Sequence, residues 1–123
     1  MEFNKTSIGA MGERIAEKGL KRMGYKILEK NFHTRFGEID IIANDGEFLV
    51  FVEVRLRKSE EHGTPFETVT YYKQQRIRKS ALLYSMRCKT MPPIRFDVVG
   101  IVGEYKGKKF VVETFEVIKN AYF

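Results

Sequence analysis

Two acids and an arginine stand among apolar residues in the segment GEIDIIANDGEFLVFVEVR, residues 37–55. Asp40 and Glu53 interrupt runs of Ile, Val and Phe that are typical of buried strands. A carboxylate in such a strand is costly to desolvate unless it pairs with a cation, binds a metal or stays near solvent. Arg55 follows Glu53 by two positions. The segment therefore predicts either a reactive site or an ion pair.

A hairpin brings these residues together. Residues 44–46, Asn-Asp-Gly, are the strongest turn signal in the sequence and predict a reversal between strands over 38–43 and 47–57. If Asp45 and Gly46 form the turn alone, the pairing of the two strands is fixed, because the side chains of a strand alternate between its faces.

In that register Asp40 faces Phe51 and Glu38 faces Glu53, so all four point to one side of the sheet together with Arg55. Asp40 and Glu53 become diagonal neighbours, with backbones about 7–8 Å apart. The opposite side is a plain apolar face formed by Val50, Val52, Val54 and Leu56. A loop one residue longer would place the two acids on opposite faces.

Two carboxylates at this separation can converge on one hard cation, Mg²⁺ or Mn²⁺, which takes oxygen ligands and keeps several waters. Such a cation polarises a phosphoryl group and activates water. Arg55, on the same face, could stabilise the developing charge. The structural alternative is that Glu53 and Arg55 pair with each other or with Glu38.

Two helices are predicted from apolar side chains spaced three and four residues apart. The first covers 7–23 and ends before Gly24, and Glu13 flanks its apolar stripe. The second covers roughly 67–88, follows a polar loop over 57–65, and places Ile77, Ala81, Tyr84 and Cys88 on one face.

The remaining strands are predicted over 25–32, 94–102 and 108–118, with a turn through 103–107 between the last two. The resulting order, α-β-β-β-α-β-β, predicts an α/β fold with a central mixed sheet flanked by helices. At 123 residues, the chain is expected to form a single domain, 1–123.

Composition favours an anionic partner. The net charge is +6 and the pI is near 9.5, which puts nucleic acid first among the candidates. The longest apolar run, residues 48–52, is far too short to cross a membrane, and we identify no secretory signal. The single cysteine, Cys88, excludes an internal disulfide. We therefore expect a cytoplasmic protein.

Basic residues gather after the third strand and along the second helix, where tyrosines lie nearby. They could follow a phosphate backbone while the tyrosines stack on unpaired bases, or they could form an ordinary solvated surface. The candidates for nucleic-acid contacts are Arg57, Lys58, Arg76, Arg78 and Lys79.

Several motifs together resemble known families. G-E-I-D at 37–40 followed by F-V-E-V-R at 51–55 resembles the D…(D/E)-x-K core of the PD-(D/E)xK nuclease superfamily. The whole chain is similar to the YraN-like family of small bacterial proteins, through G-x-x-G-E before and at Glu13, G-Y-x-I-L-x-x-N at 24–31 and R-F-D-V-V at 95–99.

This resemblance implies a restriction-endonuclease-like fold similar to that of archaeal Holliday-junction resolvases. It implies a Mg²⁺- or Mn²⁺-dependent endonuclease acting on structured or branched DNA, with Asp40 and Glu53 as metal ligands and Glu13 as a helix-borne acid at the same metal. Glu38 would orient Arg55 or a water. Because resolvases act as dimers on two-fold symmetric junctions, the resemblance also implies a homodimer.

Arg55 departs from the motif, because it stands where the superfamily carries a lysine. Arginine stays charged and cannot accept a proton, although it can contact a phosphate. Lys73, on the second helix, is the candidate substitute, and its alternative is a solvent-facing lysine. The departure leaves open a non-catalytic nucleic-acid-binding module on a nuclease-like scaffold, or an interaction protein whose charge is incidental.

Overall fold

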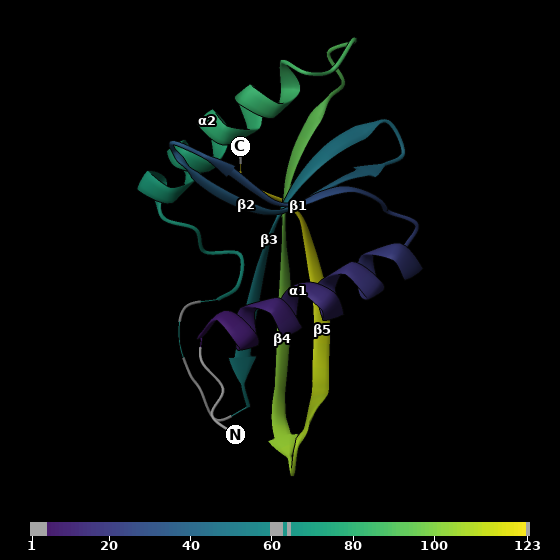
Figure 1. Ribbon diagram of the computed structural model, residues 1–123, viewed down its shortest axis with the longest axis vertical. Helices are drawn as coiled ribbons and strands as arrows, with labels where there is room; N and C mark the ends of the chain where they lie inside the picture. The colour runs from purple at the N-terminus through teal and green to yellow at the C-terminus, as the bar shows by residue number, and fades with distance from the viewer. Residues whose placement is uncertain (1–4, 60–62, 64, 123) are drawn as a thin grey trace.

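The computed structural model describes residues 5–59, 63 and 65–122, and its elements follow the predicted order (Figure 1). The α/β prediction is confirmed: two helices accompany one five-stranded mixed sheet. The elements are α1 (Lys5–Arg22), β1 (Lys26–Thr34), β2 (Gly37–Asp45), β3 (Phe48–Lys58), α2 (Tyr71–Ser85), β4 (Ile94–Lys106) and β5 (Lys109–Tyr122).

The strands lie in sequence order, β1-β2-β3-β4-β5. Antiparallel pairing joins β1 to β2, β2 to β3 and β4 to β5, whereas β3 and β4 run parallel. A parallel pair needs a long crossover connection, and α2 lies within it. The sheet is therefore a three-stranded antiparallel unit, β1 to β3, joined through the parallel β3–β4 pair to the β4–β5 hairpin, with β3 at its centre.

The helices cover opposite faces of the sheet. Ala16 and Leu20 of α1 are fully buried in one apolar cluster with Val50 and Val52, while Ala81 of α2 packs in another with Phe51. Figure 1 shows α1 crossing in front of β4 and β5, and α2 at the upper left, beside β2. The predicted alternation of β3 is confirmed, since its even-numbered valines face α1 and Phe51 faces α2.

The end of α1 is fixed by backbone hydrogen bonds. Gly24 adopts φ 93°, its N–H donates to the Lys21 carbonyl at 3.0 Å, and the Tyr25 N–H donates to the Leu20 carbonyl at 3.0 Å. This pair of bonds is a Schellman cap. It turns Tyr25 into the core, where its hydroxyl donates to the buried Asp97 carboxylate at 2.8 Å. The cap thereby sets the position of the whole helix on the sheet.

The predicted register of the β2–β3 hairpin was wrong by two residues. Asp45 pairs with Phe48 and Ile41 with Val52, so the turn residues are Gly46 and Glu47. Gly46 supplies the positive φ, 59°, that the first position of such a turn requires. A shift of two residues preserves the predicted faces, because side chains alternate with a period of two.

Asp45 stays in the strand because cations hold it there. Arg95 donates to its carboxylate at 2.7 Å and Lys119 lies 3.3 Å away. Arg95 also pairs with Asp97 at 2.9 Å. This network of charges ties the ends of β2, β4 and β5 together.

Other predicted boundaries also change. The helix α2 is shorter than 67–88, because the Thr70 hydroxyl caps it by accepting the Lys73 N–H at 3.2 Å. The turn between β4 and β5 lies at Gly107, with φ 65°, rather than over 103–107. The strand β5 continues to Tyr122, which is buried. Within the described ranges, neither helix has the length and apolar character that a membrane span needs.

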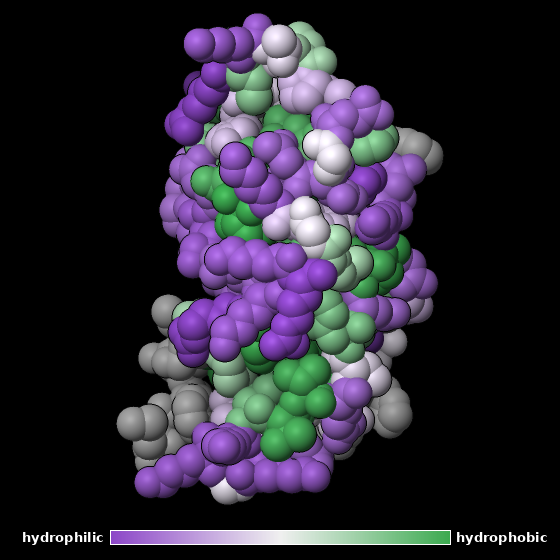
Figure 2. All heavy atoms as spheres, turned by 90° about the vertical axis from the view of Figure 1, so that its right-hand side faces the viewer, coloured by the Kyte–Doolittle hydropathy of each residue, from purple (hydrophilic) through white to green (hydrophobic). Residues whose placement is uncertain are grey.

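The outer strands β1 and β5 are the edges of the sheet. Figure 2 views the molecule from the right of Figure 1 and shows a mostly hydrophilic surface with a hydrophobic area in its lower part, toward the end that carries the β4–β5 turn. Near that turn, β5 leaves Val111 and Val112 more than a third exposed.

Gly100 allows the loop before α2 to lie against β4. A Cβ added at Gly100 would lie 2.3 Å from the Phe66 ring, which is buried. We expect Gly100→Ala to lower the free energy of unfolding by about 2 kcal/mol, because the ring must be displaced. Gly9 of α1 is the control, since a Cβ there meets no atom within 4 Å. Gly9→Ala should be neutral or stabilising by helix propensity, and equal losses from both variants in urea unfolding would contradict this packing.

Candidate functional site

Three carboxylates meet where α1 approaches β2. Glu13, Glu38 and Asp40 each offer an oxygen, and these oxygens all lie within 4.8 Å of one another. Glu13 comes from α1, while Glu38 and Asp40 come from β2. The prediction that Glu13 flanks the apolar stripe explains this position, because the neighbouring Ala16 is fully buried against the sheet.

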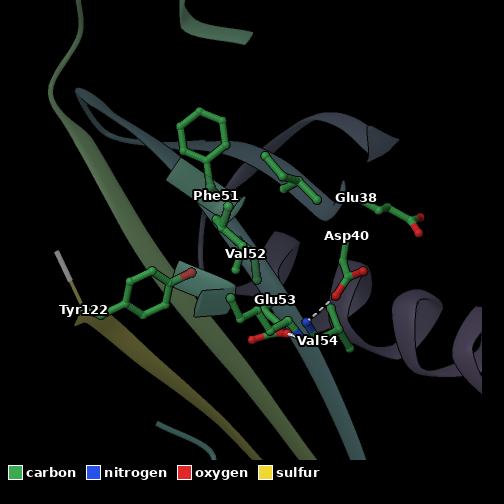
Figure 3. A pocket seen from close by; sticks show the side chains of 10 residues that line it. Glu38, Asp40, Phe51, Val52, Glu53, Val54 and Tyr122 are labelled. Carbon is green, nitrogen blue, oxygen red and sulfur yellow. Dashed lines mark hydrogen bonds and ion pairs between the residues drawn. The ribbon is translucent and has the colours of Figure 1, made fainter. Parts of the chain in front are cut away.

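Asp40 lies just beyond the point where the backbone pairing of β2 and β3 ends. The ladder runs from the hairpin turn to Ile41 and Val52, and its continuation would place Asp40 opposite Glu53. Instead of a further backbone bond, the Val54 N–H donates to the Asp40 carboxylate at 2.8 Å, the dashed line in Figure 3. The Asp40 side chain therefore replaces part of the sheet ladder and is held firmly in place.

The protonation of the acidic cluster is perturbed. Burial raises the pKa of the Asp40 carboxyl to about 6, opposed by the hydrogen bond from Val54 and reinforced by the charges of Glu13 and Glu53. Burial, and then the charge of Glu38, raise the pKa of Glu13. One Glu13 carboxylate oxygen is buried with no hydrogen-bond partner among the described residues. The charge of Lys30 and a hydrogen bond from Asn31 oppose the rise for Glu13, and His33 lies 3.7 Å from Glu38, but within the described residues no ion pair reaches Glu13 or Asp40.

Glu53 lies apart from this cluster. Only 8 % exposed, it contacts the Lys73 ammonium, and its other oxygen lies 3.4 Å from the Arg55 guanidinium. Figure 3 shows the Glu53 and Asp40 carboxylates directed to different sides of β3 near Val54. The ion pair between Glu53 and Arg55, predicted from the sequence as the alternative to a metal site, is present.

Arg55 is held on two sides. Besides facing Glu53, its guanidinium donates to the Phe66 carbonyl at 2.9 Å. The Lys73 side chain, by contrast, is 53 % exposed and reaches Glu53 from α2. Of the two cations considered for the lysine role, Lys73 is the more accessible.

Two cavities meet at Asp40. One, of about 350 Å³, lies on the α2 side and is lined by Glu53, Lys73 and Tyr122 as well as Asp40. The other, of about 240 Å³, lies on the α1 side, with Glu13 at its wall. Asp40 borders both, so a small ligand in either cavity would contact it.

The residues present fit a divalent cation. Mg²⁺ and Mn²⁺ take carboxylate oxygens, and Glu13, Glu38 and Asp40 offer three that already converge. The unpartnered oxygen of Glu13 is the kind of orphaned group that a cation would satisfy. Of the predicted ligands, the structure brings Glu13 and Asp40 together, adds Glu38, and leaves Glu53 with Lys73 and Arg55.

The predicted basic residues divide into separate groups. Arg76 and Lys79 lie on the side of α2 that borders the β1–β2 turn, whereas Arg78 lines a hollow on the other side with Leu82. Toward the end of β3, the Arg57 guanidinium lies 4.2 Å from the centre of the Phe66 ring, and Lys58 is exposed. They do not form one continuous surface.

Sequence reasoning missed Arg35 and Phe36, the two residues of the β1–β2 turn. The Arg35 guanidinium lies 4.8 Å from the centre of the Phe36 ring, and the Lys79 ammonium lies 5.3 Å from it. The signal for them is a basic residue followed by an aromatic one before Gly37, but the predicted strand ended at residue 32 and the turn was not assigned.

Comparison with known proteins identifies close relatives. A protein of Thermodesulfovibrio yellowstonii named as a UPF0102 protein is 47 % identical over 119 residues, 97 % of this chain and 98 % of its own length. UPF0102 proteins of Clostridium botulinum strain Kyoto and Clostridium kluyveri are 41 % and 40 % identical, covering 99 % and 98 % of this chain and 98 % and 96 % of their own lengths.

The family model described as "Uncharacterised protein family UPF0102" matches residues 12–101. That span contains Glu13, the β2 and β3 acids, Arg55 and Lys73. The predicted membership of the YraN-like family is thereby confirmed, and the chain belongs to the UPF0102 family.

Proposed function

We propose that this protein is a divalent-metal-dependent endonuclease that hydrolyses phosphodiester bonds in structured or branched DNA, on a scaffold of the PD-(D/E)xK type. The observation that carries the proposal is the convergence of Glu13, Glu38 and Asp40 within 4.8 Å beside a cavity that also contains Lys73. Glu13 and Asp40 are partly buried and have no ion-pair partner among the described residues, and acids in such a position are expected where a ligand supplies the missing charge.

In this proposal the three carboxylates of the acidic cluster bind the cation, and the fixed carboxylate of Asp40 sets its position. The Val54 N–H fixes one oxygen of Asp40, so the other is directed away from the strand pair. Once bound, Mg²⁺ or Mn²⁺ supplies polarisation of the phosphoryl group and activation of water. Glu13, on α1, would bind the same cation with its carboxylate.

Lys73 supplies positive charge on the opposite side of the site. Its ammonium contacts Glu53 at the wall of the cavity, where it can stabilise charge that develops on a phosphate. Arg55 positions Glu53 and the Phe66 backbone rather than contacting the substrate, since it is only 22 % exposed and does not line the cavity, whereas Lys73 is 53 % exposed and does. We therefore assign the role of the superfamily lysine to Lys73.

A non-catalytic nucleic-acid-binding module is the second candidate function. It is favoured by Arg55, which cannot transfer a proton and is committed to Glu53 and Phe66. This alternative predicts salt-dependent DNA binding without turnover in Mn²⁺.

The test is cleavage of labelled four-way junction, flap, single-stranded and duplex DNA by the full-length protein in Mn²⁺. We expect the wild type to cut at least one branched substrate, and we expect Asp40→Ala to reduce cleavage below detection while circular dichroism shows a folded protein. Lys108→Ala, at the exposed turn after Gly107, is the control that should keep wild-type rates. Equal cleavage by Asp40→Ala would contradict the site, and silence of the wild type on every substrate would favour the binding module.

A further inference from the structure

A series of hollows leads away from the acidic site along α2. The cavity beside Asp40 shares Glu38, Lys73 and Ile77 with a hollow of about 330 Å³. That hollow in turn shares Tyr72 and Arg76 with one of about 360 Å³ at the β1–β2 turn. Because neighbouring hollows share lining residues, the three follow one another along α2. We call the two hollows farther from Asp40 the α2 groove; its lining includes Arg35, Phe36, Tyr72, Lys73, Arg76 and Lys79, and the carboxylate of Glu38 lies at its end toward Asp40.

The α2 groove is rich in uncompensated positive charge. Within the part of the chain that the structure describes, no carboxylate lies within ion-pair distance of Arg35, Arg76 or Lys79. Arg76 is nonetheless held in place, because its Nε donates to the Phe36 carbonyl at 2.6 Å. A fixed cation without an acidic partner is suited to an external anion.

Aromatic rings stand among these cations. Tyr72 is 74 % exposed, and the Arg76 guanidinium lies 5.9 Å from the centre of its ring. The Phe36 ring, which is half-buried, has the Arg35 guanidinium 4.8 Å and the Lys79 ammonium 5.3 Å from its centre. An exposed ring beside cations, as at Tyr72, suits unpaired bases, whose faces are free to stack, whereas the bases of a duplex already stack on one another.

We propose that the α2 groove binds an unpaired nucleic-acid strand, with its phosphates on Arg35, Arg76 and Lys79 and a base stacked on Tyr72. As a statement about substrate it rests on the proposed function, because it gives the acidic site DNA that has a single-stranded arm. The order of the hollows along α2 would lead the strand from the β1–β2 turn past Lys73 to Asp40.

Of two neighbouring tyrosines of α2, only Tyr72 lines the α2 groove. Tyr71 is as exposed as Tyr72, at 76 %, yet it lines neither hollow. Tyr71→Ala and Tyr72→Ala therefore remove the same side chain from adjacent exposed positions, and only the second removes a groove wall. For charge, Lys79→Gln is matched by Lys108→Gln at the exposed β4–β5 turn.

The experiment measures fluorescence anisotropy of labelled single-stranded, forked and blunt-duplex oligonucleotides of equal length, with EDTA present so that no cleavage occurs. We expect the single-stranded and forked probes to bind more tightly than the blunt duplex. Tyr72→Ala should weaken single-strand binding at least about fivefold, the loss of one stacked base, and leave duplex binding unchanged. Tyr71→Ala should match the wild type.

Lys79→Gln should lower single-strand affinity and reduce the slope of log affinity against log salt by about 0.7, whereas Lys108→Gln should change neither. Equal losses from Tyr71→Ala and Tyr72→Ala, or tightest binding of the blunt duplex, would overturn the proposal. Absence of cleavage in Mn²⁺ with this binding pattern intact would defeat the proposed nuclease and leave the single-strand site standing. If the wild type cleaves DNA but Tyr72→Ala loses no single-strand affinity, the nuclease proposal stands and the single-strand site is wrong.

Discussion

Asp40→Asn is expected to stabilise the metal-free protein while it removes cleavage. Burial raises the pKa of Asp40 to about 6 in the folded chain, against 3.8 for an ordinary aspartate. The folded state therefore holds the proton more tightly than the unfolded state, and ionising Asp40 at neutral pH costs on the order of 2–3 kcal/mol. An asparagine keeps an oxygen that can accept the Val54 N–H and carries no charge. The variant should thus gain stability and lose the cation ligand.

The sign of the pH dependence follows from the direction of that shift. Because the folded pKa is raised, the cost is absent when Asp40 is protonated in both states, below about pH 4, and grows as the pH rises to about 6. The stability advantage of Asp40→Asn should therefore be larger at pH 7.5 than at pH 4, as measured by thermal or urea unfolding in EDTA.

Asp97→Asn is the matched control. Asp97 is fully buried but receives hydrogen bonds from Tyr25 and Arg95, so its charge is compensated. Neutralising it should destabilise the fold, the opposite sign from Asp40→Asn. Addition of Mn²⁺ should raise the melting temperature of the wild type and of folded Asp97→Asn, but not of Asp40→Asn. A destabilised Asp40→Asn, or one that Mn²⁺ still stabilises, would mean that the acidic cluster is a structural network.

The fold was largely predictable because its signals are local. Apolar periodicity identified both helices, and alternation along β3 separated Val52 from Phe51 correctly. The hairpin turn was misplaced by one residue, which shifts the strand register by two, since Asp45 is kept in the strand by Arg95 and Lys119, which are distant in sequence. The faces were nevertheless right, because an error of two positions restores the alternation.

The acidic site was only partly predictable for a related reason. The prediction that Asp40 and Glu53 are diagonal neighbours across the hairpin assumed that β2 and β3 stay paired beyond this point, but their backbone pairing ends at Ile41 and Val52. Beyond that point Asp40 bonds to Val54, so its neighbours become Glu13 and Glu38. A strand pattern gives the face of each residue, but it does not say where two strands separate.

The α2 groove required the tertiary structure. Arg76 and Lys79 were recognised as basic, yet nothing in the helix pattern distinguished them from Arg78. That difference arises because the β1–β2 turn lies against one side of α2 and brings Phe36 to it. A single strongly charged helix can thus carry a binding surface on one side and an unrelated surface on the other.

Lys73→Gln is expected to lower the cleavage rate at least about 100-fold with little change in stability. Its ammonium is the accessible cation in the cavity beside Asp40, and a donor that stabilises developing charge contributes about that much to the rate. Glu53 would keep Arg55 as its partner, so the fold should lose about 1 kcal/mol or less. Single-turnover rates in Mn²⁺ together with melting temperatures check both parts.

Arg55→Gln should have the opposite effects, a larger loss of folding stability and a smaller loss of cleavage rate. It removes the donor to the Phe66 carbonyl and leaves the buried Glu53 with Lys73 alone, which should cost about 2 kcal/mol of folding stability. Below the melting temperature, folded Arg55→Gln should retain more activity than Lys73→Gln, because Arg55 does not line the cavity beside Asp40. If Lys73→Gln instead cuts at the wild-type rate and Arg55→Lys cuts faster, the motif position on β3 is the catalytic one and Lys73 serves only to neutralise Glu53.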